Sequence, residues 1–168
     1  MKDLSIGVNI SWQIAAQEAV AANLQFIEKE HIFIGMCSLD KVLILSQEKT
    51  GLKPEDRKAL EFEHYALEYL FRGFELNLTQ IRRHLRKRLG KGNYKKTEKV
   101  VHRSDACKKI FNLASELPAP ASVITCLHLL VAILEEPGKI VSRVLNDAGV
   151  ESKDLMERAL ATAIKEKV

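Results

Sequence analysis

The sequence has few of the residues that mark secreted, fibrous or membrane proteins. Its 168 residues include 3 cysteines, 4 prolines and 8 glycines, which excludes a disulfide-stapled scaffold and a collagen-like chain. The longest apolar stretch, 127–134, is interrupted by His128 and is far shorter than the roughly 20 residues that span a bilayer. Cys37, Cys107 and Cys126 lack a Cys-x-x-Cys spacing, so we expect reduced thiols in a cytoplasmic protein without a membrane segment.

Catalytic patterns are also missing. The segments 90–92 (Gly-Lys-Gly) and 138–140 (Gly-Lys-Ile) lack the spacing and the hydroxyl of a P-loop, which cradles nucleotide phosphates. The five histidines show no His-x-x-x-His pairing that would place two metal-ligating imidazoles on one helical face. We therefore expect no enzyme activity in this chain, no cofactor and no metal site.

What the sequence does contain is helical periodicity. Apolar residues recur at a spacing of three to four, while the alternation typical of strands is absent over any useful length. Pro54 is typical of a first helical turn, and Gly51 and Gly149 are typical of helix C-termini. The pattern predicts an all-α protein with helices at about 9–25, 30–46, 54–72, 78–89, 105–117, 124–136, 139–148 and 153–165.

An internal repeat organises these helices. The segment 30–36 (Glu-His-Ile-Phe-Ile-Gly-Met) recurs as 127–133 (Leu-His-Leu-Leu-Val-Ala-Ile), and Ser5 upstream of the first copy corresponds to Ser104 upstream of the second. Each copy is too small to bury its apolar faces alone, so the two should pack around a shared core with a pseudo-two-fold relation.

These residues resemble the double Clp repeat, the N-terminal domain of the Clp/Hsp100 AAA+ unfoldases. The first repeat is marked by Ala15-x-x-x-Ala19 and by the segment 27–32, and the second by the segments 128–134 and 144–150. The resemblance implies an all-α fold in which two pseudo-symmetric four-helix Clp repeats form one compact bundle with an extra helix inserted between them. The expected single domain, 1–168, divides into repeat one (4–52), the inserted helix (53–75), a basic helix and loop (76–103) and repeat two (104–168).

The resemblance also implies a function. Such a domain is a non-catalytic module that binds adaptor proteins, or unfolded or tagged substrates, for a Clp-type ATP-dependent unfoldase, protease or chaperone. It is attached to an AAA+ ring where it is part of a longer protein, and whether this chain is an excised domain or a stand-alone protein stays open. A partner helix laid into a groove would be a specialised form of the same recruitment.

Three residues are candidates for substrate or adaptor binding through the same resemblance. In some relatives a glutamate at the position of Glu30 and a hydroxyl residue at the position of Ser5 help form a pocket for phosphorylated arginine. The carboxylate pairs with the guanidinium, and the hydroxyl contacts the phosphate. Ser104 keeps the hydroxyl in the second repeat, but Leu127 replaces the acid. A structural role competes for Glu30, because a carboxylate stabilises a helix N-terminus. For His31 and its counterpart in the second repeat we favour a ring nitrogen that fixes the preceding turn.

The basic residues are concentrated in one segment. Between residues 82 and 99 there are nine basic residues against one acidic residue, Glu98. A stripe of Leu78, Ile81 and Leu85 predicts that the arginines occupy the opposite, solvated face of this helix. The alternative function is therefore a basic all-α module that binds nucleic acid or another polyanion through residues 82–99, although nucleic acid is not the partner we expect. The possible polyanion contacts are Arg82, Arg83, Arg86, Lys87 and Arg88.

The inserted helix is rich in aromatic residues. Five of the ten aromatic residues of the chain lie between 62 and 74. One face, Leu60, His64, Leu67 and Phe71, has the spacing of a buried helical stripe, so core packing is the favoured interpretation. A partner-binding face is the alternative.

Overall fold

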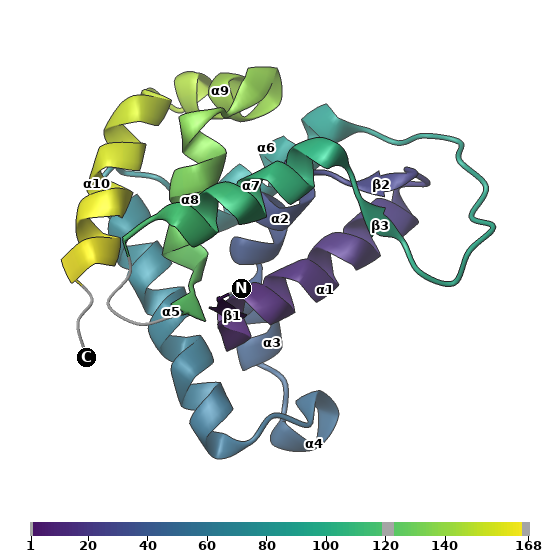
Figure 1. Ribbon diagram of the computed structural model, residues 1–168, viewed down its shortest axis with the longest axis horizontal. Coiled ribbons are helices and arrows are strands. Elements are labelled where there is room, and N and C mark those ends of the chain that lie inside the picture. The colour runs from purple at the N-terminus through teal and green to yellow at the C-terminus, as the bar shows by residue number, and fades with distance from the viewer. Residues whose placement is uncertain (1, 119–122, 166–168) are drawn as a thin grey trace.

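The computed structural model describes residues 2–118 and 123–165, and predictions for the other positions, including the last residues of repeat two, lie outside them. Among these described residues it has ten helices and four strands of two residues each (Figure 1). The first part of the chain forms β1 (Asp3–Leu4), α1 (Ile6–Ala21), β2 (Phe26–Ile27), α2 (Lys29–Met36), α3 (Leu39–Leu43) and α4 (Gln47–Thr50). Two further helices, α5 (Pro54–Arg72) and α6 (Leu78–Leu89), precede β3 (His102–Arg103), α7 (Asp105–Glu116), β4 (Val123–Ile124), α8 (Cys126–Glu135), α9 (Gly138–Asp147) and α10 (Ser152–Lys165). The predicted all-α bundle is confirmed.

The strands join the two repeats to each other. β1 pairs in parallel with β4, so that Leu4 lies opposite Ile124, and β2 pairs in parallel with β3, so that Ile27 lies opposite Arg103. The sequence did not predict these strands, because two residues are too few to show an alternating pattern. As a consequence, the start of α1 lies beside the start of α8, and the start of α2 lies beside the start of α7.

The same capping residues begin equivalent helices in both repeats. The hydroxyl of Ser5 accepts a hydrogen bond from the Val8 amide (3.2 Å), and that of Ser104 accepts one from the Cys107 amide (3.1 Å). Such N-caps satisfy backbone donors that would otherwise lack a partner.

The two corresponding histidines fix the turns before α2 and α8. The Glu28 amide donates to Nδ1 of His31 (2.9 Å), and the Thr125 amide donates to Nδ1 of His128 (3.0 Å). The turn-fixing role predicted for these histidines is confirmed. Both rings are buried, so the sequence signal they carry is structural.

The core lies around α2 and α8, the two most completely buried helices. α1 packs on α2, α7 packs on α8, and α10 covers α8 as α6 covers α2. Gly35 on α2 lies so close to the backbone of Ser11 on α1 that an added Cβ would overlap the Ser11 carbonyl oxygen. The close approach of these two helices therefore requires a residue without a side chain at this position.

The helix predicted over 30–46 is wrong in its length. The chain forms α2, then α3, and then α4 after a further break. The Ser38 hydroxyl donates to the carbonyl of Ile34 (2.6 Å), and Ser46 starts a new helix by accepting from the Lys49 amide. Both serines use their hydroxyls on backbone groups and so compete with a continuous helix. Gly51 ends α4 with φ of 68°, as its C-terminal position predicts.

The inserted helix α5 packs on both repeats, against α1, α3 and α8. Leu60, Leu67 and Phe71 are buried, and the Phe71 ring meets the ring of Phe33 on α2 edge-on at 6.1 Å. Each such buried side chain contributes roughly 1.5–3 kcal/mol. The predicted core face is confirmed, while Phe62, Tyr65 and Tyr69 lie exposed on the other side.

Candidate functional site

The structure does not bring Ser5 and Glu30 together. Gly35 lies against Ser11, and the His31 ring is close enough to Glu18 for the carboxylate to affect its pKa, so α2 runs antiparallel to α1. Glu30 therefore lies near the C-terminal end of α1, while Ser5 caps its N-terminus. At a rise of about 1.5 Å per residue the two ends are about 20 Å apart.

A residue of the inserted helix occupies the place beside Ser5. The Glu63 carboxylate accepts three hydrogen bonds: from the Ser5 hydroxyl (2.8 Å) and the Cys126 amide (3.0 Å) at Oε1, and from the Gly7 amide (2.7 Å) at Oε2. The two amides belong to the first turns of α8 and α1, where unpaired donors and the helix dipoles favour a negative charge. Glu63 is only 9% exposed, so this carboxylate closes the Ser5 site from inside the protein.

Sequence reasoning missed Glu63. The signal was its spacing: Glu63 comes three residues after Leu60 and therefore lies on the same helical face as Leu60, His64 and Leu67. An acid on a buried helical face needs partners, because an unpaired buried charge is costly. That rule could have singled out Glu63 but could not have named Ser5 as its partner.

Ser104 and Glu30 lie at the same end of the molecule, although they belong to different repeats. β3 runs beside β2, and the Ser104 amide donates to the carbonyl of Ile27 (3.0 Å), two residues before Lys29 opens α2. Burial raises the pKa of Cys107, in the first turn after Ser104, to about 12; Arg103 opposes this shift, and the nearby carboxylates of Glu28 and Glu30 contribute to it. The pairing of β3 with β2 thus places Ser104 of repeat two at the same end of the molecule as Glu30 of repeat one.

Glu30 itself is largely buried, and burial raises the pKa of its carboxyl group while its backbone hydrogen bond and Lys29 lower it. A cationic partner stabilises the ionised form of a buried carboxyl group, because the ion pair offsets the cost of removing the charge from water. Beside this end, the Arg103 guanidinium lies over the ring of Trp12 at 4.3 Å and over that of Phe111 at 4.8 Å.

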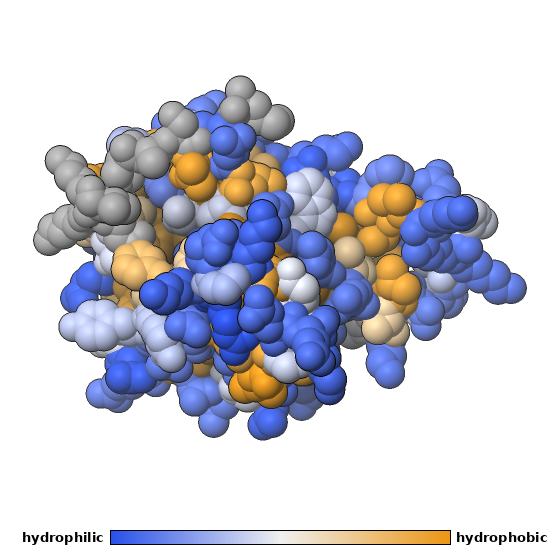
Figure 2. Space-filling view, turned by 90° about the horizontal axis from the view of Figure 1, so that it is seen from below, coloured by the Kyte–Doolittle hydropathy of each residue, from blue (hydrophilic) through white to orange (hydrophobic). Residues whose placement is uncertain are grey.

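A second feature of this end is an apolar surface along α1. The chain after α6 crosses the end of α1, because the Gly92 amide donates to the carbonyl of Ala22 (2.8 Å) and the Tyr94 amide to that of Asn23 (3.0 Å). Figure 2 shows hydrophobic residues at the surface of this end of the molecule, on the right. We call this surface the α1 groove, and its principal residues are Trp12, Ala16, Val20, Leu24, Phe26, Tyr94, Val100 and Val101.

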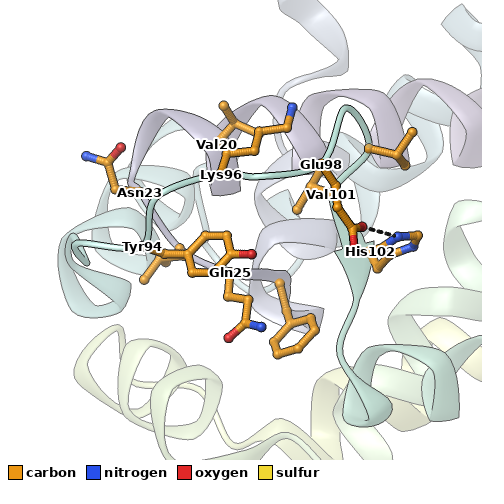
Figure 3. Close-up of a pocket in the computed structure, with 11 residues that line it drawn as sticks. Val20, Asn23, Gln25, Tyr94, Lys96, Glu98, Val101 and His102 are labelled. Carbon is orange, nitrogen blue, oxygen red and sulfur yellow. Dashed lines mark hydrogen bonds and ion pairs between the residues drawn. The ribbon is translucent and has the colours of Figure 1, made fainter.

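The α1 groove contains a small pocket beneath the crossing chain (Figure 3). Tyr94 and Val20 line it, and His102 and Glu98, joined at 3.0 Å, lie at the β3 side. Its volume is about 200 Å³, below the roughly 300–1,000 Å³ of cavities that hold drug-sized ligands. Val100 nearby is 63% exposed. This pocket of the groove therefore suits an apolar side chain of a protein better than a small molecule.

No protein-family model matches the sequence, and no curated protein matches it. Among solved structures, the crystal structure of the Hsp104 N-terminal domain from Candida albicans matches with a TM-score of 0.63 at 12% sequence identity, covering 95% of this chain and 90% of that chain. The chain has the fold of a Clp/Hsp100 N-terminal domain. At this identity the likeness establishes the fold, and the fold agrees with the resemblance seen in the sequence.

On this Clp/Hsp100 fold the basic helix α6 differs from expectation. Arg82 is not on the solvated face: it is 5% exposed and lies 3.9 Å from Asp40, and α6 packs against α2. Arg86 pairs with Glu18 at 2.7 Å. Of the remaining candidates, Arg83 and Lys87 line a surface beside α1, and Arg88 pairs with Asp147 on α9 at 3.0 Å. Arg82, Arg86 and Arg88 thus each pair with a different acidic residue.

The three cysteines are buried and unpaired, as expected from their positions. Burial raises the pKa of Cys37 and that of Cys126, where the neighbouring Glu63 carboxylate adds to the effect. Raised thiol pKa values disfavour the reactive thiolate. In the part of the chain that the structure describes, no group of three histidine, cysteine or acidic residues is placed to hold a metal ion. Within the same residues, none of the helices is both long and apolar enough to cross a membrane.

Proposed function

We propose that this chain is a non-catalytic binding domain that recruits adaptor proteins, or unfolded or tagged protein substrates, to a Clp-type ATP-dependent unfoldase. The observation that carries the proposal is the α1 groove, an exposed apolar surface on a Clp/Hsp100 N-terminal fold. Val20 and Phe26 are both about 40% exposed, and contiguous exposed apolar surface is typical of sites that bind other proteins. Buried cysteines are typical of a reducing compartment, and a cytoplasmic location is part of the proposal.

In this function the groove supplies both anchoring and orientation. Apolar side chains of a client enter the pocket and the strip along α1, and most of the affinity comes from a few such anchors rather than from the whole contact area. The polar side chains of Asn23 and Gln25 at the rim of the pocket (Figure 3) offer hydrogen bonds to a client backbone.

The test is binding of an unfolded protein, reduced and carboxymethylated α-lactalbumin labelled with fluorescein, followed by anisotropy. The variants Val20→Asp and Val100→Asp place a charge in the groove and should each raise the dissociation constant at least about tenfold. Ile44→Asp, at a residue that is 79% exposed outside the groove, is the matched control and should leave binding unchanged. Equal effects of all three variants would exclude the α1 groove as the client site.

Salt dependence separates recruitment from the polyanion alternative. Apolar capture of a client should change little between about 50 and about 200 mM salt, whereas binding to nucleic acid through several phosphate contacts should weaken by orders of magnitude. The pairing of Arg82, Arg86 and Arg88 with acidic residues lowers the charge available to phosphates and does not favour that alternative.

The proposal also includes recognition of phosphorylated arginine, and the residues proposed to bind it are Glu30 and Ser104. This end keeps both a carboxylate and a hydroxyl, whereas Ser5 already donates to Glu63. The Glu30→Gln and Ser104→Ala variants should each weaken binding of a phosphoarginine peptide, and Ser5→Ala should not. Unchanged binding in Glu30→Gln would remove this part of the proposal and leave the α1 groove unaffected.

A further inference from the structure

A second surface, distinct from the α1 groove, lies where α6 and α9 pack side by side (Figure 1). An open groove with a volume of about 860 Å³ runs between the two helices. It carries four basic side chains and one acidic side chain. We call it the α6–α9 groove, and its lining residues are His84, Lys87, Arg88, Lys139, Ile140, Ser142, Arg143, Asn146 and Asp147.

Helix stability explains only part of this charge. Lys87 and Arg88 lie in the last turn of α6, where cations interact favourably with the helix dipole. Lys139 lies in the first turn of α9, which has no acidic residue, and a cation at that end opposes the dipole. Lys139 therefore does not stabilise α9 through the helix dipole, whereas Arg143 pairs with Asp147 one turn further along the same helix.

Asp147 shows how the groove holds a carboxylate. Its Oδ2 atom lies 3.0 Å from Nη2 of Arg88, and its Oδ1 atom lies 3.8 Å from Nε of Arg143. One carboxylate is thus shared by two guanidinium groups that come from different helices. With Lys87 and Lys139 also exposed along the groove, the charge of this surface remains positive.

We propose that the α6–α9 groove binds an acidic segment of a partner protein. Its charge is complementary to glutamate and aspartate side chains, and the apolar side chain of Ile140 offers a contact for an aliphatic residue between them. Nucleic acid fits less well, since single strands are held by stacking on aromatic side chains and the nine lining residues of this groove include none apart from the His84 ring. The groove provides a contact that does not depend on the α1 groove.

The test uses the whole chain and a fluorescein-labelled peptide of glutamates interspersed with leucines. The double charge reversal Lys87→Glu with Lys139→Glu should raise the dissociation constant at least about tenfold. The matched control is Lys58→Glu with Lys153→Glu, which makes the same change in net charge at exposed positions on α5 and α10 and should alter binding less than about threefold. Circular dichroism melting checks that both variants remain folded.

Three outcomes would overturn the proposal: no binding of the peptide by the unmodified chain, an equal loss in the control variant, or tighter binding of a DNA oligonucleotide that depends on the same two lysines. The Val20→Asp variant separates this proposal from the proposed function, because it should lose the unfolded client and keep the acidic peptide. Loss of the peptide in Val20→Asp would likewise contradict two independent sites.

Discussion

The Ser5 hydroxyl donates a hydrogen bond to the Glu63 carboxylate across 2.8 Å, and so joins the first helix of repeat one to the inserted helix. The same carboxylate reaches the first turn of α8 through the Cys126 amide. One side chain of the insertion therefore connects both repeats. The two hydroxyl positions, Ser5 and Ser104, are equivalent by the repeat, and Ser5 donates a hydrogen bond to a buried carboxylate from the inserted helix.

We predict that Glu63→Ala destabilises the protein by about 3 kcal/mol or more. The substitution removes a carboxylate with three hydrogen bonds and leaves the half-buried Ser5 hydroxyl and the buried amides of Gly7 and Cys126 without this partner. Such a loss costs roughly 1–3 kcal/mol for each buried group. Urea unfolding followed by circular dichroism measures the change. Glu61→Ala, on a more exposed part of α5, should change stability by less than about 0.5 kcal/mol, and similar losses in both variants would contradict a bridging role for Glu63.

The close contact between α1 and α2 predicts the effect of Gly35→Ala. An added methyl group meets the backbone of Ser11 rather than a flexible side chain, so the helices must separate, at a cost of about 1–3 kcal/mol. Gly73→Ala is the comparison, because Gly73 has a helical φ of −60° and its nearest neighbour to an added Cβ is at 3.3 Å. Thermal unfolding should show a lower Tm for Gly35→Ala and little change for Gly73→Ala.

The aromatic residues of α5 should divide into two groups by their effect on stability. Phe71→Ala removes a fully buried ring and should cost about 3–5 kcal/mol, whereas Tyr69→Ala removes a ring that is 79% exposed and should cost less than about 0.5 kcal/mol. Denaturant midpoints measure both changes. A large loss in Tyr69→Ala would show that the exposed aromatic face is covered within the protein in solution.

The capping histidines predict a loss of stability on mild acidification. Burial lowers the pKa of His31 and that of His128 below the ordinary value of 6.5. The folded protein therefore binds fewer protons than the unfolded chain, and their contribution is complete above about pH 6.5 and is lost as the pH falls below it. Urea unfolding at several pH values between about 5.5 and about 7.5 should show this decline.

A His128→Gln variant is the control for this pH dependence. Glutamine does not titrate, so the decline below pH 6.5 should be shallower in the variant than in the unmodified chain.

Glu30 has the opposite effect on the pH dependence of stability. Burial raises the pKa of its carboxyl group above 4.5, so its contribution to stability is lost as the pH rises through the pKa that it has in the folded protein. Repeating the series in Glu30→Gln removes that effect, and parallel profiles with and without His128 would contradict the prediction.

Much of the fold was predictable because its signals are local. The spacing of apolar residues predicts most of the helices, and the matched segments that contain His31 and His128 predict two similar units. Short-range capping chemistry also predicts where helices end, as at Gly51. The continuous helix over 30–46 failed because hydroxyl groups at Ser38 and Ser46 bond to the backbone, which periodicity does not show.

The site was less predictable because it depends on pairing between distant segments. Glu30 and Ser5 belong to one repeat, and the sequence offered no reason to combine Glu30 with Ser104 instead. The burial of Arg82 beside Asp40 was missed for the same reason, since the partner comes from α3. Phosphoarginine recognition stays a prediction, now attached to Glu30 with Ser104. The polyanion contact also stays a prediction, which the ion pairs of Arg82, Arg86 and Arg88 do not favour.

The crosswise pairing of the four short strands has a consequence for how the protein assembles. Leu4 pairs with Ile124, 120 positions away, and Ile27 pairs with Arg103, 76 positions away. Contacts of such high sequence separation carry a loop-closure cost that helices and helical hairpins do not. Helical hairpins such as α1–α2 and α7–α8 are therefore expected to form first, with the strand pairs closing late. The surroundings of Ser5 and of Ser104 are complete only after the strands have paired. A partly folded chain would therefore contain most of its helices but neither of these two hydroxyl sites.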